Sequence, residues 1–142
     1  TPEGYNVGIL MSGQGPAADA HGNIYVSVGN GSVGNRGNPH DPINRGESLL
    51  RLDWDGKLLR LTDWFTPANW QDLENTDNDF GNSGVLLIPG TTLAFCGSKE
   101  GRVYKARDRK PWHDLLFFLK SNFSPLYRRK RAEFSRDPYF ES

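Results

Sequence analysis

The sequence has few of the features that assign a protein to a class at first sight. It holds one cysteine, Cys96, in 142 residues, which excludes an internal disulfide and a cysteine-rich zinc site. No apolar run reaches the roughly 18 residues of a membrane-spanning helix, so no membrane span is expected. No basic and then apolar signal segment follows Thr1, and such a start is typical of an internal piece of a longer chain.

Net charge is absent as well, because the 17 Lys and Arg residues equal the 17 Asp and Glu residues. The balance shifts along the chain. Residues 1–109 hold 10 basic against 13 acidic side chains, and residues 110–142 hold 7 against 4. Neither excess forms the clustered basic face that nucleic-acid binding usually needs, so no nucleic-acid partner is expected.

Turn-forming residues are plentiful. Sixteen glycines and nine prolines are scattered among short apolar runs, which favours many turns and short strands over long helices. The 36% of hydrophobic residues are enough for a modest core. The composition therefore predicts an all-β fold.

Short strands can be placed on this pattern. Ile24, Val26 and Val28 alternate on one face, and Asp55-Gly56 gives the strongest hairpin signal of the chain. The segments with strand character are 22–32, 47–67, 85–89 and 93–109. The polar segments between them, 33–46 and 68–84, are predicted to be loops, and the first of these is expected to bury little.

Two of the predicted hairpins repeat. A shift of 70 residues places Ile24–Val26 on Ala94–Cys96, and a shift of 54 residues places Leu49-Leu50 on Val103-Tyr104. The first copy therefore looks like the second with an insertion at its turn. Because an isolated hairpin cannot bury its apolar face, repeated hairpins normally stack or close into a ring.

Motifs within these hairpins are similar to a known repeat. Gly97–Gly101 followed by Val103-Tyr104 matches the first half of that repeat, and Leu52-Asp53, Gly56-Lys57 and Trp64 match the second half. Over roughly residues 4–104 the chain resembles the PQQ-repeat, quinoprotein-like β-propeller proteins of bacteria.

The resemblance implies antiparallel, four-stranded propeller blades. At about 40 to 50 residues per blade, the chain is too short to close a ring, so residues 1–109 are expected to be a partial propeller of about two blades. The pattern fails from Lys105, and residues 110–142 are predicted to be an atypical basic and aromatic tail, irregular or partly helical. The apolar run Leu115–Leu119, with Asp114 before it and Lys120 after it, predicts about two turns of helix there.

A calcium loop is the first candidate site. Asn75, Asp77 and Asp79 alternate as hard oxygen ligands would, but Phe80 and Leu86 stand where an EF-hand needs Gly and Glu. A looser calcium site stays open as an alternative to an Asx-turn-rich connecting loop.

The quinone enzymes among the proteins that the chain resembles hold PQQ over calcium, and many of them have a disulfide between adjacent cysteines. Cys96 has no neighbouring cysteine, and no residue here is matched to the calcium ligands or to the catalytic base. PQQ and calcium are thus implied by the resemblance alone. Cys96 itself is interpreted as a small buried thiol on an alternating strand, with a nucleophilic role as the alternative.

Other chemistry-bearing residues have ordinary interpretations. His21, His40 and His113 are scattered and form neither a zinc pattern nor a catalytic triad. The glycine-rich stretch 29–37 lacks the Gly-Lys-Ser/Thr of a phosphate loop. The basic stretch 127–134 could contact phosphates or anionic lipid, although a solvated tail is the simpler interpretation.

A group of aromatic residues surrounds the second hairpin, and it could form a sugar or quinone stacking platform. We expect it to serve packing between blades instead, because aromatics supply much of the buried area in small sheets. The group consists of Trp54, Trp64, Phe65 and Trp70.

These observations favour a non-catalytic segment of a PQQ-like repeat propeller that acts as a binding or interaction scaffold. No catalytic, cofactor-binding or metal-binding residue is assigned. One alternative is a fragment of a PQQ- and calcium-dependent alcohol or sugar dehydrogenase, and the other is an extracellular carbohydrate-binding module. The remaining blades or protein partners, self-association through exposed strand edges, and a periplasmic or secreted location are expected with the first.

Overall fold

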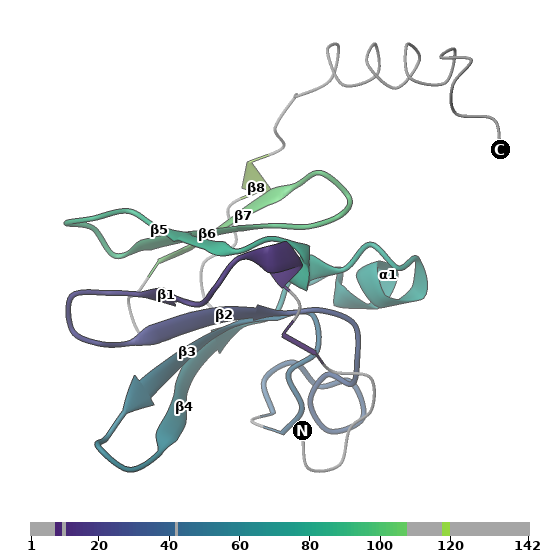
Figure 1. The fold of residues 1–142 in the computed structure, drawn as a ribbon. Helices are drawn as coiled ribbons and strands as arrows, with labels where there is room; N and C mark the ends of the chain where they lie inside the picture. The colour runs from purple at the N-terminus through teal and green to yellow at the C-terminus, as the bar shows by residue number, and fades with distance from the viewer. Residues whose placement is uncertain (1–7, 10, 42, 108–117, 120–142) are drawn as a thin grey trace, which may run out of the picture.

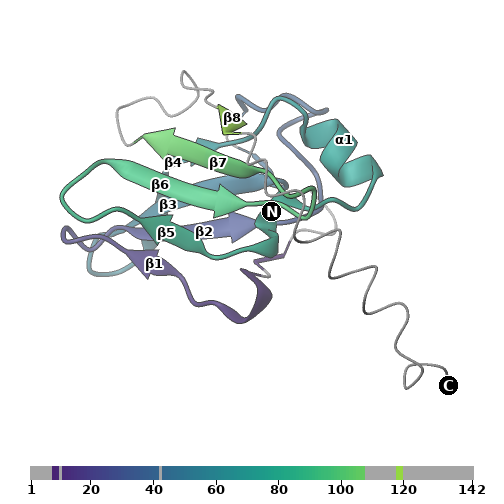
Figure 2. The ribbon, with the colours of Figure 1, turned by 90° about the horizontal axis from the view of Figure 1, so that it is seen from above.

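Two antiparallel β-sheets make up most of the protein. The computed structural model describes residues 8–9, 11–41, 43–107 and 118–119. One sheet lies over the other, and the short helix α1 (Trp70–Asn75) lies beside one end of the pair (Figures 1 and 2). The predicted all-β, antiparallel class is confirmed. None of the helices in these described ranges is long and apolar enough to cross a membrane.

The first sheet is a simple meander with the order β1-β2-β3-β4. Its strands are β1 (Ala17–Ala18), β2 (Ile24–Val28), β3 (Ser48–Trp54) and β4 (Leu59–Phe65). The hairpin predicted at Asp55-Gly56 joins β3 to β4. There the Asp55 carboxylate accepts hydrogen bonds from the backbone N–H groups of Lys57 and Leu58, at 2.9 and 2.8 Å.

The second sheet repeats this meander with the order β5-β6-β7-β8. Its strands are β5 (Val85–Leu87), β6 (Leu93–Gly97), β7 (Val103–Arg107) and β8 (Phe118–Leu119). The hairpins matched by the sequence repeat, β2–β3 and β6–β7, are the central hairpins of the two sheets. The inserted turn of the first hairpin spans residues 29–47, whereas residues 98–102 suffice in the second.

The helix predicted at residues 115–119 is wrong for Phe118 and Leu119, which pair with Tyr104 and Val103 of β7. The other three residues of that run lie outside the described ranges. An apolar run of this length suits a strand as well as a helix, and β7 offers an edge on which a strand can pair. The tail predicted at 110–142 therefore contributes a strand to the second sheet.

The chain between the two sheets is not the continuous loop predicted for residues 68–84. It contains α1 and the 3-10 turn η2 (Phe80–Asn82), and a further 3-10 turn, η1 (Met11–Gly13), precedes β1. Leu73 and Phe80 are buried, at 1% and 0% exposure. Single apolar residues in a polar segment thus anchor it to the core, a tertiary effect that composition does not reveal.

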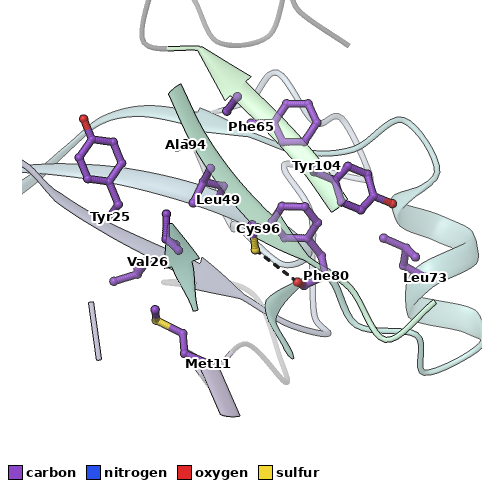
Figure 3. Packing of buried hydrophobic residues seen from close by; sticks show 12 residues of the cluster. Met11, Tyr25, Val26, Leu49, Phe65, Leu73, Phe80, Ala94, Cys96 and Tyr104 are labelled. Atoms are coloured by element: carbon purple, nitrogen blue, oxygen red, sulfur yellow. Dashed lines mark hydrogen bonds between the residues drawn. The ribbon is translucent and has the colours of Figure 1, made fainter. Parts of the chain in front are cut away.

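The core lies between the two sheets (Figure 3). Phe80 packs edge-on against Tyr104 with ring centroids 5.0 Å apart, and Phe65 lies 6.1 Å from Phe80. The buried cluster comprises Met11, Tyr25, Val26, Leu49, Phe65, Leu73, Phe80, Val85, Ala94, Cys96, Tyr104 and Ala106. Both sheets and the segment between them contribute to one core, so the burial of each sheet depends on the other.

The segment 33–46 buries more than predicted. Val33, Asn44 and Arg45 are all buried, and Val33 forms an isolated bridge with Arg45. The guanidinium of Arg45 lies 3.9 Å from the Trp64 ring centroid, and the Trp64 indole N–H donates to the Pro39 carbonyl oxygen at 3.0 Å. The inserted turn thus folds back onto β4, and contacts with distant residues bury its polar side chains.

Backbones approach closely where η2 meets the end of β2. A Cβ atom on Gly81 would lie 2.4 Å from the backbone nitrogen of Gly29 and 2.4 Å from the carbonyl carbon of Val28. No side chain fits there without moving one of the two segments. Glycine at this position therefore allows the two sheets to dock.

We expect Gly81→Ala to lower the free energy of unfolding by about 1–3 kcal/mol, because the methyl group overpacks a rigid backbone contact. Gly15→Ala is the matched control, since a Cβ atom there meets no atom within 4 Å. Urea unfolding followed by tryptophan fluorescence measures both. Equal stability of the two variants would contradict the close approach.

Candidate functional site

Three connections gather at one end of the two sheets, the end where α1 lies (Figure 1). They join β2 to β3, β4 to β5 and β6 to β7, and they span residues 29–47, 66–84 and 98–102. We call this the loop end. It holds the buried carboxylates Glu47 and Asp79 as well as a hollow, so the candidate site is built here.

Glu47 is a buried carboxylic acid at the start of β3, with 0% exposure. Its Oε2 atom accepts a hydrogen bond from the backbone N–H of Phe80 at 2.6 Å. Its Oε1 atom has no hydrogen-bond partner among the described residues. Glu47 also has a φ of 48°, a conformation that non-glycine residues seldom adopt, so the surrounding fold holds it in place.

Burial raises the pKa of Glu47 to about 7. The Phe80 N–H and Lys99 act in the opposite direction, whereas the negative charges of Asp79 and Glu74 raise the pKa further. Because the pKa is raised on folding, the acid contributes stability that is fully present below pH 4.5 and is lost as the pH rises toward 7. Perturbed acids of this kind are frequent at functional sites.

Asp79 is the second buried carboxylate of the loop end, at 5% exposure. The Lys99 ammonium lies 2.6 Å from Asp79 Oδ2 and 3.3 Å from Asp77 Oδ2. These partners raise the pKa of Lys99, the hydrogen bond to Asp79 being the largest cause. The Lys99 backbone N–H also donates to the Asp79 carbonyl oxygen at 3.1 Å. One lysine thus fixes the turn between β6 and β7 to the segment before η2.

The donor set of the alternative calcium site does not fit a metal. The Lys99 ammonium bridges Asp77 and Asp79, so a cation is already paired with both carboxylates, and Asn75 is the last residue of α1. Across the described ranges, no group of three His, Cys, Asp or Glu side chains is placed to hold a metal ion. The segment is also not a loop of Asx turns alone, since it contains the end of α1 and the start of η2.

A hollow of about 300 Å³ opens at the loop end between the inserted turn and α1. We call it the loop-end hollow. Trp70 forms one wall, and a Cβ atom on Gly37 would lie 3.3 Å from its ring. Its lining is Ser32, Val33, Gly34, Asn35, Arg36, Gly37, Ile43, Asn44, Trp70 and Glu74. The buried Asn44 Oδ1 atom has no partner among the described residues. The loop-end hollow therefore combines one aromatic wall with amide, cationic and anionic groups.

Cys96 is buried on β6, as predicted. Its thiol lies 3.6 Å from Ser83 Oγ. The thiol also lies 3.7 Å from the Phe80 carbonyl oxygen (Figure 3). Burial raises the pKa of the thiol, so the reactive thiolate is disfavoured at neutral pH. The geometry supports the interpretation of Cys96 as a core residue.

The structure does not bring the other predicted candidates together. His21 and His40 are exposed and lie in separate turns, and His113 is outside the described ranges. The stretch 29–37 leads to β3 rather than to a helix, so it is not a phosphate loop. The basic stretch 127–134 is also outside the described ranges.

The four aromatic residues do not form one platform. Phe65 lies in the inter-sheet core, whereas Trp54 is 57% exposed beside the β3–β4 turn. Trp64 stacks under Arg45, and Trp70 lines the loop-end hollow. Packing between the sheets, the role expected for the group, is therefore correct for Phe65 but wrong for the other three.

A second hollow, of about 630 Å³, lies at the opposite end, between the β1–β2 and β5–β6 turns. Its acidic residue, Asp19, accepts hydrogen bonds from Asn23 Nδ2 at 2.7 Å and from the Tyr25 hydroxyl at 2.9 Å. Burial acts to raise the pKa of Asp19, but these hydrogen bonds together with two from backbone N–H groups outweigh it, and the net pKa is lowered. Asp19 thus serves to order its own turn.

Sequence reasoning missed Glu47 and Lys99. Glu47 follows directly on Gly46 where the inserted turn ends, and a charged residue immediately before β3 is the only signal in the sequence. No family model, curated protein or solved structure matches the chain.

Removing the lysine tests the electrostatics of the loop end. We expect Lys99→Met to lower the free energy of unfolding by about 1–3 kcal/mol at pH 7, because the buried Asp79 loses its cation. Lys57→Met, in the exposed β3–β4 turn, should change it by less than about 0.5 kcal/mol. Urea unfolding of both variants measures the difference. A Lys99→Met chain as stable as the Lys57→Met chain would contradict the pairing.

Proposed function

We propose that the chain is a pair of neighbouring blades of a PQQ-repeat-like β-propeller and acts as a non-catalytic binding or interaction scaffold. One observation carries the proposal. Two four-stranded meanders follow each other in the chain and share one core between them.

The connectivity supports the propeller interpretation. In a propeller, each blade is a four-stranded antiparallel sheet, and consecutive blades pack around a central axis. Here the last strand of the first sheet, β4, leads through α1 and η2 to the first strand of the second sheet, β5. Since propellers typically have four to eight blades, two blades require further sheets to close a ring. The remaining blades or other protein partners would supply them.

The loop end is the binding face in this proposal. Loops on a rigid scaffold commonly carry function, because they vary while the sheets hold them in place. The inserted turn of residues 29–47 makes one blade differ from the other at this end. A non-catalytic role is preferred because the buried thiol is inert and Lys99 is already paired with the carboxylates of Asp77 and Asp79.

The alternative of a PQQ- and calcium-dependent dehydrogenase fragment receives less support. Such a fragment needs acidic or amide oxygens that are open to calcium, and Asp77 and Asp79 are bridged by an ammonium group instead. A periplasmic or secreted location belongs to the propeller proposal, and it rests on the resemblance to PQQ-repeat proteins.

Thermal unfolding with and without PQQ plus calcium separates the first two functions. A ligand stabilises only the state that binds it, so a scaffold without this cofactor site should show an unchanged Tm. We expect the Tm to shift by less than about 1 °C when the PQQ concentration is raised a hundredfold. A rise of several degrees that depends on both PQQ and calcium would contradict the non-catalytic proposal and favour the dehydrogenase.

A specific observation favours carbohydrate binding as the second candidate function. The loop-end hollow places Trp70 beside Asn35, Arg36 and Glu74, and sugars are held by an aromatic wall with a few polar groups around it. Binding at this hollow is compatible with a scaffold, because it needs no catalytic residue.

A glycan screen with Trp70→Ala tests this candidate. If the hollow binds sugars, glycan binding should fall at least tenfold in Trp70→Ala, because the aromatic wall is lost. Trp54→Ala is the matched control, since Trp54 is exposed at the opposite end. Equal binding by both variants would place the glycan elsewhere, and binding by neither the parent chain nor the variants would reject the carbohydrate candidate.

An incomplete ring leaves apolar surface open. Leu58, Leu59 and Leu86 are more than half exposed, and β4 is the last strand of its sheet. We expect the chain to self-associate, because unpaired strand edges invite pairing with other chains. Light scattering across a range of concentrations measures this, and a monodisperse monomer throughout would contradict it.

A further inference from the structure

We propose that Glu47 is a proton-controlled latch that holds the segment between α1 and β5 against the first sheet. The latch closes when the Glu47 carboxyl is protonated and loosens when it carries a charge.

The latch joins two parts of the chain through one side chain. Glu47 lies at the start of β3 and is fixed by the first sheet, since its backbone N–H donates to the Gly29 carbonyl oxygen at 2.8 Å. Its carboxyl group receives the Phe80 N–H at 2.6 Å, and the Phe80 ring is fully buried among Phe65 and Tyr104. A change in the charge of the Glu47 carboxyl group therefore acts directly on Phe80, which is part of the core.

The charged groups around Glu47 come from three elements. They are Glu74 on α1, Asp79 immediately before η2, and Lys99 in the β6–β7 turn. The ammonium of Lys99 is already paired with Asp79 at 2.6 Å and with Asp77 at 3.3 Å. A negative charge on Glu47 thus adds to the negative charges of Glu74 and Asp79. Lys99, the one cation among these groups, is already paired with other carboxylates.

The uncharged form suits this site. A neutral carboxyl can still accept the Phe80 N–H at Oε2, and its proton turns the unpartnered Oε1 into a donor. Asp79 Oδ1 is a buried acceptor in the same region and has no partner among the described residues. Ionisation of Glu47 places a second buried negative charge near Asp79, and burying a charge without a partner is costly.

The pKa of Glu47, raised by burial to about 7, places the change in the physiological range. In an opened state the carboxyl would return to its ordinary pKa, so opening becomes easier as the pH rises from about 5 to 8. Opening would lift η2 from β2, where Gly81 abuts Val28 and the Ser27 hydroxyl donates to the Ser83 carbonyl oxygen at 2.7 Å.

Amide hydrogen exchange of Phe80 in the full chain tests the latch. We expect the protection factor of this N–H to fall on the order of 50-fold between pH 5 and pH 8, after correction for the intrinsic exchange rate. In Glu47→Gln, which keeps an acceptor oxygen without a charge, the fall should be less than about threefold. Asp72→Asn, an exposed acid on α1, is the matched control and should behave as the parent chain does.

A second measurement does not depend on any variant. In the parent chain labelled with ¹³C at glutamate carboxyl groups, one glutamate should titrate with a midpoint near pH 7. Glu74→Gln should lower that midpoint, because it removes a neighbouring negative charge. If every glutamate titrates below about pH 5, or if Phe80 protection falls equally in Glu47→Gln, the latch is wrong.

Discussion

The rest of the structure depends on the way Phe80 is held. Its ring fills the space between the two sheets, and its backbone N–H is fixed by the buried Glu47 carboxyl. Either group alone would leave a buried polar group unpaired. Without Glu47 the Phe80 N–H would have no acceptor, and without Phe80 the Glu47 carboxyl would have no donor. Together they give the Phe80 N–H an acceptor and Glu47 Oε2 a donor, and buried polar groups are tolerated when they are hydrogen-bonded. The two sheets consequently share one core at the point where the chain crosses between them.

The two ends of the sheet pair have different chemistry. The end with the β1–β2 and β3–β4 turns satisfies its acids locally, as Asp19 and Asp55 do with neighbouring N–H groups. The loop end instead brings together charged groups from distant parts of the chain, such as Glu47 and Lys99, and buries them in part. Local hydrogen bonds order a turn without further consequence. Long-range burial of charge makes the stability of the loop end depend on pH.

The sheets could be predicted from the sequence because their signals are local. The apolar alternation at residues 24–28 and the Asp55-Gly56 turn depend on neighbouring residues, and the strand and the hairpin are found where these patterns placed them. The candidate site could not be predicted in the same way. Glu47 acquires its character from Phe80, which is distant in the chain, and no spacing rule connects the two.

The same reasoning explains the other differences. The inserted turn looked solvent-exposed because its residues are polar, yet Arg45 is buried through its contact with Trp64. The run ending at Leu119 could become helix or strand, and pairing with β7 decided in favour of the strand. The calcium pattern at Asp77 and Asp79 can be recognised in the sequence, but the lysine that pairs with both carboxylates comes from another hairpin.

The meander order of both sheets has a consequence for how the chain folds. Every pairing within a sheet joins strands that are neighbours in sequence. Each sheet can therefore form from its own hairpins at a small entropy cost of loop closure. Docking of the sheets is the non-local step, and it needs the crossing segment to be in place. On this route the hairpins form the early nuclei, and two formed but undocked sheets would expose the apolar residues that the docked sheets bury between them.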